Sequence, residues 1–275
     1  MYKPQLQKLK ISFFIYVIFS SQALKASPLC TQIVASGNPE YPPYLWRDPH
    51  DDTRLIGANA DLMNLIAQEI GIKIVVKHLG DWGRVQEETK QGKIDLIAGA
   101  FFNLRRLEYM DYIHPPVRET KTVIWTQKEA RFSYQKWSDL KGLQGVTVIN
   151  NSFGEEFDRY AKESLKILTV PSLEQALKMV QSGRMNYLIY ELDPGLAYAA
   201  RLNIKNLKTM SPPIGHEDLY VTLSYKSPCN TPEIRGLLAK ALYKLIRQKS
   251  VMKKLIRNNI QLWENQQILA HNGRN

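Results

Sequence analysis

Four residues spread along this chain of 275 residues have side chains suited to holding a small charged molecule. Arg106 lies near the start of a predicted helix, where free backbone N–H groups attract anions and an arginine can clamp a carboxylate. Glu191 follows a predicted buried strand, so its carboxylate suits a ligand ammonium. Tyr41 and Trp82 follow two other strands, and two aromatic rings can sandwich an apolar or cationic part of a ligand. These residue types predict a site for a small anionic or zwitterionic ligand.

Each of these residues also fits an ordinary structural role. Arg105 and Arg106 could both be solvated surface residues, and Glu191 could form a surface ion pair. Either aromatic ring could be a packing residue. Because adjacent residues on a helix point in different directions, at most one of the two arginines is expected to face the site. The residues alone leave these alternatives open.

Two polar residues are placed where helices are expected to begin. Asn103 can cap a helix starting at Leu104. Ser152 can cap another helix, and Glu155 can complete a capping box there. Both helix starts would also attract anions, because their first N–H groups are free.

Strands and helices are predicted to alternate along the chain, which indicates an α/β fold with a mostly parallel sheet flanked by helices. Ligands bind beyond the carboxyl ends of the strands in such sheets, so the site residues should meet at that edge. The predicted strands are 32–36, 72–76, 94–98, 146–149 and 187–190, with crossing strands at 122–127 and 219–224. Helices are expected at 82–90 and 154–165, around Leu62 to Ile70 and Leu173 to Val180, and in two apolar stripes at the end.

The N-terminus has the layout of a secretory signal peptide over residues 1–26. Lysines precede the short apolar stretch 11–19, and small residues follow, with cleavage expected after Ala23 or Ala26. The apolar stretch is about half of the roughly 20 residues that span a bilayer, so export is favoured over a membrane anchor. We expect a soluble protein in the periplasm.

The net charge is only weak support for a nucleic-acid partner, and none is expected. The whole chain has a formal charge of +11, but residues 1–26 contain four lysines and no acid, which leaves 33 basic against 26 acidic groups. Basic residues are not interleaved with aromatic residues in any block, so net charge is the one feature that would support nucleic-acid binding. No metal-ligand spacing and no nucleophile–base pair is apparent, and no cofactor is expected.

The chain has two cysteines, Cys30 and Cys229. In an oxidising compartment two distant cysteines favour a disulfide, although two buried free thiols are the alternative. An internal similarity links the segment 91–97 to the segment 182–189, since both contain Gly, a basic residue, an apolar residue, Asp or Asn and a buried strand. Two lobes built from one unit would explain this similarity, and chance would explain it too.

The chain resembles the extracytoplasmic solute-binding proteins of family 3, the amino-acid-binding type. The resemblance covers roughly residues 31 to 265. The matching segments are Tyr41-Pro42-Pro43-Tyr44, Gly57 to Asp61, Trp82, Gly92-Lys93-Ile94-Asp95, Arg106 with Asp111-Tyr112, Asp139-Leu140-Lys141-Gly142 and the stretch from Gly183 to Glu191.

The resemblance implies a role for each candidate residue. Arg106 matches the arginine that clamps a ligand carboxylate, and Ser152 matches a hydroxyl that caps the same group. Glu191 matches the acid, usually Asp, that receives the ligand ammonium. Tyr41 and Trp82 match the aromatic pair around the ligand side chain.

Other positions fit the family less closely. Gly99 matches a residue whose backbone faces the ligand. Phe101 stands where the family commonly has Thr or Ser, and Asn103 replaces a second hydroxyl. Asn38 stands where some members have Asp. Since Phe removes a hydroxyl and fills space, the ligand could be a carboxylate other than an ordinary α-amino acid, or a larger molecule.

The resemblance implies a two-lobed periplasmic-binding-protein fold of type II, joined by two crossing strands. Lobe one would take residues 27–122 and 215–275, and lobe two residues 123–214. The implied function is to close around a small carboxylate or amino-acid-like ligand for uptake by an ABC permease, as a monomer and without catalysis.

Two other functions remain open. Dehydratases that act on cyclic carboxylic acids resemble this family, and Glu191 in a dry cleft could serve as a general acid. A receptor module that senses a ligand without transporting it would have the same binding chemistry.

Overall fold

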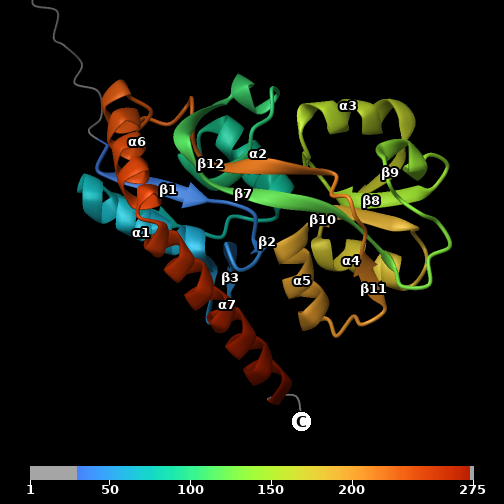
Figure 1. Ribbon diagram of the computed structural model, residues 1–275. Helices are drawn as coiled ribbons and strands as arrows, with labels where there is room; N and C mark the ends of the chain where they lie inside the picture. Colours follow the sequence, from blue (N-terminus) through green and yellow to red (C-terminus); the bar gives the residue numbers. More distant parts are fainter. Residues whose placement is uncertain (1–29, 273–275) are drawn as a thin grey trace, which may run out of the picture.

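A computed structural model describes residues 30–272 of the chain (Figure 1). The predicted signal peptide, residues 1–26, lies outside the described residues. Within the described part, no helix combines the length and the apolar character needed to cross a membrane.

One mixed sheet of nine strands runs through the protein in the order β5-β1-β6-β12-β7-β10-β8-β9, and β11 pairs with β7. Strand pairing is parallel among β5, β1 and β6 and among β10, β8 and β9, whereas β7 and β12 pair antiparallel with their neighbours. The strands are β1 (Gln32–Ser36), β5 (Lys73–Val76), β6 (Leu96–Phe101), β7 (Met110–Gln127), β8 (Gln144–Val148), β9 (Lys166–Val170), β10 (Tyr187–Glu191), β11 (Leu207–Thr209) and β12 (Gly215–Ser224).

The long strands β7 and β12 connect two halves of the molecule (Figure 1). We call the half containing β1 to β6 lobe one and the half containing β8 to β11 lobe two. Helices α1 (Ala58–Ile70), α2 (Trp82–Gln91), α6 (Pro232–Arg247) and α7 (Lys249–Asn272) belong to lobe one, and α3 (Glu155–Ser164), α4 (Leu173–Gln181) and α5 (Leu192–Arg201) to lobe two. The α/β fold with two crossing strands was predicted correctly, while the residue boundaries of the lobes stay a prediction.

Local sequence signals explain where several helices begin and end. The Asp81 side chain accepts a hydrogen bond from the backbone N–H of Arg84 at the start of α2. Helix α1 ends at Gly71, which has a φ of 69°, a conformation that favours glycine. The predicted C-terminal stripe of α6 faces the core of lobe one, through Ile234, Leu238, Ala241, Leu242 and Leu245.

Strands with polar or proline-containing sequences were not predicted. A second, antiparallel sheet consists of β2 (Glu40–Tyr41), β3 (Leu45–Asp48) and β4 (Asp51–Ile56). Most of β4 is exposed, so its sequence lacks the alternation of apolar and polar residues from which a strand is predicted. Strand β7 was expected only at 122–127 but begins at Met110, and its prolines at 115 and 116 do not prevent pairing with β12.

Cys30 and Cys229 form a disulfide with an S–S distance of 2.04 Å, which confirms the predicted bridge. The bond joins the chain just before β1 to the turn that precedes α6. It therefore fastens the two chain segments of lobe one to each other.

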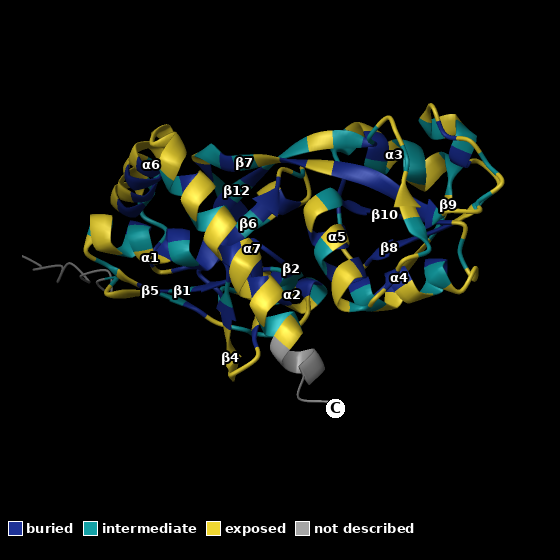
Figure 2. Cartoon of the chain, turned by 60° about the horizontal axis from the view of Figure 1, so that its bottom comes forward, coloured by how far each residue is buried: buried dark blue, intermediate teal, exposed yellow. Residues whose placement is uncertain are grey.

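Helix α7 runs along the outside of lobe one, and much of its surface is exposed (Figure 2). The Trp263 ring packs against Trp46 of lobe one and Tyr198 of lobe two, with both pairs of ring centroids 5.6 Å apart. Its indole N–H donates to the carbonyl oxygen of Ala197 at 3.4 Å. The helix thus contacts both lobes through one buried tryptophan.

Candidate ligand-binding site

A small cavity of about 30 Å³ lies between the two lobes. Lobe one contributes Asn38, Tyr41, Trp82, Gly99, Ala100, Phe101, Arg106 and Leu219, and lobe two contributes Asn151, Ser152 and Glu191. Seven of the eight residues predicted for ligand binding therefore line one cavity. The eighth, Asn103, lies beside it and donates from Nδ2 to the hydroxyl oxygen of Ser152 at 3.0 Å.

The carboxyl ends of the parallel strands bring these residues together. Phe101 is the last residue of β6, and Glu191 is the last residue of β10. Asn38 follows β1 closely, and Ser152 follows β8. The sheet edge predicted from the strand–helix alternation is the edge where the cavity lies.

Arg106 is buried between the lobes, with only 4% of its surface exposed, while Arg105 is exposed. Its Nη1 donates to the carbonyl oxygen of Phe101 at 2.8 Å and its Nη2 to that of Asn150 at 3.1 Å. Its Nε donates to Gln86 Oε1 at 3.3 Å, and the guanidinium carbon lies 5.3 Å from the centre of the Trp82 ring. Each of its three nitrogens thus has a protein acceptor, and the alternative of two solvated arginines is wrong for Arg106.

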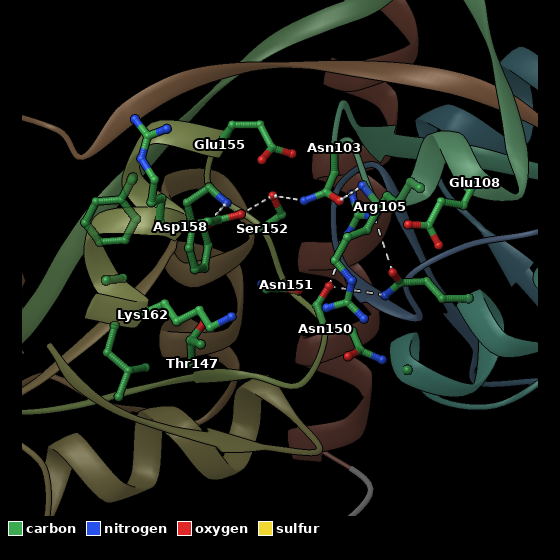
Figure 3. A pocket seen from close by; sticks show the side chains of 18 of the residues that line it. Asn103, Arg105, Glu108, Thr147, Asn150, Asn151, Ser152, Glu155, Asp158 and Lys162 are labelled. Carbon is green, nitrogen blue, oxygen red and sulfur yellow. Dashed lines mark hydrogen bonds between the residues drawn. The ribbon is translucent and has the colours of Figure 1, made fainter. Parts of the chain in front are cut away.

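Ser152 does not cap a helix, contrary to the expectation. The residue that precedes α3 is Gly154, and no side chain in the described chain caps it. The Ser152 hydroxyl instead donates to Asp158 Oδ2 at 2.5 Å (Figure 3). Glu155, expected to complete a capping box, accepts from the backbone N–H of Leu104 at 2.6 Å across the cleft. A contact within lobe two and a contact between the lobes have thus replaced the local cap.

The helix expected to start at Leu104 is a single turn of 3₁₀ helix over Arg106–Glu108. Asn103 still organises this turn, because its Oδ1 accepts from the N–H of Arg105 at 2.9 Å and its carbonyl accepts from the N–H of Arg106 at 3.0 Å. So short a turn offers little of the anion attraction of a longer helix.

Glu191 is only 2% exposed, and its Oε2 has no hydrogen-bond partner among the described residues. Burial raises the pKa of this carboxyl to about 8, an effect opposed in part by its own backbone N–H and by the charge of Arg106. The alternative of a surface ion pair is therefore wrong. The Tyr41 hydroxyl, near Thr120, is a second buried polar atom without a hydrogen-bond partner in the described part of the chain.

Gly99 lies in β6 where the chain passes close to α1. Its φ is 154°, and a Cβ atom built on it would lie 2.7 Å from Asn59 Nδ2. Asn59 donates through that atom to the carbonyl oxygen of Ala98 at 2.6 Å, so a larger residue at position 99 would disturb this bond.

A wider cleft of about 760 Å³ lies outside the cavity (Figure 3). Asn103, Asn150, Glu155 and Lys162 are among its lining residues. Arg106, Asn151 and Ser152 line both the cleft and the cavity, so they form the partition between the two.

Two residues near the partition, Gln86 and Tyr190, were not among the predicted site residues. Gln86 lies one turn after Trp82 on α2 and donates from Nε2 to the carbonyl oxygen of Asn150 at 3.3 Å. The i, i+4 spacing of Trp82 and Gln86 could have indicated that they share a face. The Tyr190 hydroxyl accepts from Asn38 Nδ2 at 3.1 Å. Because Tyr190 lies in a buried strand, its hydrogen bond could not be predicted from its residue type.

Further contacts join the lobes near the cavity. Tyr44 donates to Asp193 and accepts from Arg118, and Arg118 Nη2 lies 3.6 Å from Asp193 Oδ2. Glu40 Oε2 accepts from the backbone N–H of Leu173 at 2.8 Å. The lobes are therefore closed against each other.

Two α/β lobes that close on a cavity at the carboxyl ends of their strands define the class of two-lobed binding proteins. Within this class, the chain belongs to the bacterial extracellular solute-binding proteins, family 3, whose family model matches residues 33–260. No curated protein sequence matches the chain.

Solved structures share the fold at low sequence identity. A histidine kinase sensor domain with similarity to periplasmic binding proteins is 20% identical, with a TM-score of 0.71 over 82% of this chain and 96% of that chain. The amino acid ABC transporter substrate-binding protein AbpA from Streptococcus pneumoniae, bound to L-arginine, is 18% identical, with a TM-score of 0.69 over 85% and 96%. A mutant of ArgBP from T. maritima is 17% identical, with a TM-score of 0.69 over 84% and 96%.

Proposed function

We propose that this protein binds a small solute between its lobes, outside the cytoplasmic membrane. The observation that carries the proposal is the small cavity between the lobes, which aromatic and polar side chains of lobe one and polar side chains of lobe two line together. A ligand that contacts both lobes favours the closed arrangement over an open one. Residues 27–122 with 215–275 and residues 123–214 would be the two bodies that move.

Delivery of the solute to a membrane permease of the ABC type is the favoured role. The resemblance to a transporter substrate-binding protein supports it. The similarity to a histidine kinase sensor domain favours a second role, in which ligand binding is reported to a membrane partner. A pull-down from membranes separates the two roles, since a permease or a kinase would be recovered.

Native mass spectrometry of the purified protein tests ligand binding directly. A small molecule that leaves at raised collision energy, and a thermal midpoint that rises when this molecule is added back, are the expected results. The periplasmic location is tested by cell fractionation, and cleavage of residues 1–26 by the mass of the mature chain. A protein that is pure, folded and free of any bound solute, and that no small molecule stabilises, would contradict the proposal.

Binding without turnover is the proposed activity. The rival is acid catalysis by Glu191, whose burial and raised pKa are features that general acids also have. If the recovered molecule is converted into a product, and Glu191→Gln abolishes this conversion, the protein is an enzyme on the same scaffold.

A further inference from the structure

We propose that the side of lobe one where α6 and α7 meet is a docking surface for an anionic phospholipid bilayer. This inference goes beyond solute binding, and the identity of the solute does not enter it. It rests on the sign and the exposure of the charges on these two helices, and on which of the charges already have an ion-pair partner.

The sequence of the two helices carries charge of one sign. Residues 234–263 include eight lysines and arginines and no aspartate or glutamate. Two of the eight are paired: Arg235 Nη1 lies 3.5 Å from Asp111 Oδ2. Lys244 Nζ lies 2.7 Å from Glu69 Oε2. The other six are exposed and form no ion pair with any described residue, and we call them the basic surface: Lys240, Arg247, Lys249, Lys253, Lys254 and Arg257.

The basic surface holds much of the charge of the protein. Without the four lysines of residues 1–26, the 37 basic groups of the chain fall to 33 against 26 acidic groups, a net charge of +7. Six unpaired positive charges on two adjoining helices therefore correspond in number to most of this excess. Such a patch attracts an anionic surface over a Debye length, which is about 10 Å at about 0.1 M salt.

Helix stability does not explain the charges of α7. Lys249 lies in the first turn of α7, which contains no acid, although the N-terminus of a helix favours negative side chains. Lys249, Lys253 and Arg257 are spaced four residues apart, so like charges are neighbours on one face and disfavour the helix. A negatively charged partner would offset this repulsion.

Exposed apolar side chains accompany the charges on α6. Leu237 is 41% exposed and Tyr243 is 55% exposed. Their spacing from Lys240 and Arg247 puts all four side chains on one face of the helix, and Figure 2 shows an exposed band along α6. Leucine can enter the boundary between headgroups and acyl chains, and tyrosine is enriched at membrane interfaces. Cations mixed with single apolar groups on one helix face fit a bilayer surface.

The residue types favour a lipid surface over a protein partner. Four of the six residues of the basic surface are lysines, and lysine is depleted in protein–protein interfaces. None of the six lines the cavity or the wider cleft between the lobes. Docking through the basic surface would therefore leave the solute site uncovered.

Vesicle co-sedimentation of the protein purified after export tests the proposal. Vesicles of equal parts phosphatidylglycerol and phosphatidylcholine are the probe, and vesicles of phosphatidylcholine alone are the control. We expect binding to the anionic vesicles only, at about 0.1 M salt. Binding should be lost at about 1 M salt, where the Debye length falls to about 3 Å.

A matched pair of variants assigns the binding to the basic surface. Each lysine or arginine near an anionic bilayer contributes about fivefold in affinity, so the loss of four should weaken binding about a hundredfold or more. The α7 variant combines Lys249→Gln, Lys253→Gln, Lys254→Gln and Arg257→Gln. The control variant removes four exposed basic residues of lobe two by Arg131→Gln, Lys166→Gln, Arg184→Gln and Lys205→Gln. The two variants have the same net charge, and the control should keep most of the binding.

The variants should also fold, because all eight side chains are exposed and glutamine is a good helix former. An unchanged thermal midpoint checks this. Arginine in place of Lys249, Lys253 and Lys254 keeps the charge, so this third variant should bind the anionic vesicles like the wild type.

Three results would overturn the proposal. An equal loss in the α7 variant and the control variant would assign binding to net charge alone. Equal binding to both kinds of vesicle, or binding that survives about 1 M salt, would refute an electrostatic surface. Failure to bind anionic vesicles would refute the lipid partner, and loss of a membrane protein from the pull-down of the α7 variant would then assign the surface to that protein. Solute binding is measured without vesicles, so its outcome is separate.

Discussion

The guanidinium group of Arg106 in lobe one donates to the carbonyl oxygen of Asn150 in lobe two at 3.1 Å. Asn150 has a φ of 60°, a left-handed conformation that Asn adopts more readily than most residues. The same carbonyl accepts from Gln86, so two side chains of lobe one meet at one oxygen of lobe two. A charged donor therefore fastens the lobes together beside the cavity.

Arg106→Ala should open the lobes and destabilise the protein. The change removes the charged donor from the carbonyl oxygens of Phe101 and Asn150, at a cost on the order of 3 kcal/mol in the free energy of unfolding. Urea unfolding and the radius of gyration from small-angle scattering measure the two effects. Arg105→Ala removes an exposed neighbour and should change neither quantity. Equal behaviour of the two variants would refute this role.

Glu191 should make the protein less stable as the pH rises. The folded carboxyl has a pKa of about 8, above its ordinary value of 4.5, so between these values the folded protein holds a proton that the unfolded chain releases. The free energy of unfolding should therefore fall by about 1.4 kcal/mol per pH unit between about pH 5 and about pH 8 from this group alone, and level off above.

The groups that face Glu191 do not alter this expectation. The pKa of Tyr41 and of Tyr190 lies well above its ordinary value because both side chains are buried, so neither titrates in this range. Urea unfolding at several pH values should show a flatter dependence for Glu191→Gln than for the wild type. Glu156→Gln, at an exposed acid of α3, is the control and should keep the pH dependence of the wild type. A pH dependence that survives in Glu191→Gln would have to come from another group.

Trp263→Ala should free helix α7 from lobe two. The tryptophan is 7% exposed and packs on aromatic residues of both lobes, so its removal should cost about 3–5 kcal/mol. Hydrogen exchange should become faster in the last turns of α7. The neighbouring Leu262 is 40% exposed, so Leu262→Ala should cost less than about 1 kcal/mol. Unchanged exchange in Trp263→Ala would show that the contact does not hold the helix.

Phe101→Ser should widen the range of ligands. Phe101 lines the cavity and is 6% exposed, so a smaller residue adds space and a hydroxyl next to Arg106. We expect glycine or L-serine to raise the thermal midpoint of this variant more than that of the wild type, although its unliganded form should lose about 3–5 kcal/mol of stability. Phe102→Ser, at a residue that is 40% exposed, is the control. If Phe101→Ser gains no binding, Phe101 does not limit the size of the ligand.

Much of the site could be predicted because side-chain chemistry and strand ends are visible in the sequence. Glu191 lies at the end of its strand and Ser152 beyond its strand, and both line the cavity at that edge of the sheet. What could not be predicted is which atoms Arg106 contacts. Two of its three acceptors are the main-chain oxygens of Phe101 and Asn150, and a carbonyl oxygen is present at every residue, so no residue type indicates these two contacts.

The same limit explains the errors in the fold. Apolar periodicity revealed α6 and the buried parallel strands, whereas the exposed β4 has no such pattern. The apolar stripe of α7 indicated that it packs on a core, but the contact of Trp263 with Tyr198 depends on the closed arrangement of the lobes. Contacts between the two lobes leave little trace in local sequence.

The disulfide between Cys30 and Cys229 turns most of the chain into a covalent ring. Its two cysteines are 199 residues apart, and the whole of lobe two lies on the chain between them. A protease that cuts once within lobe two would therefore open the ring without releasing a fragment. The nicked molecule would keep its mass until a thiol reductant divided it into two peptides.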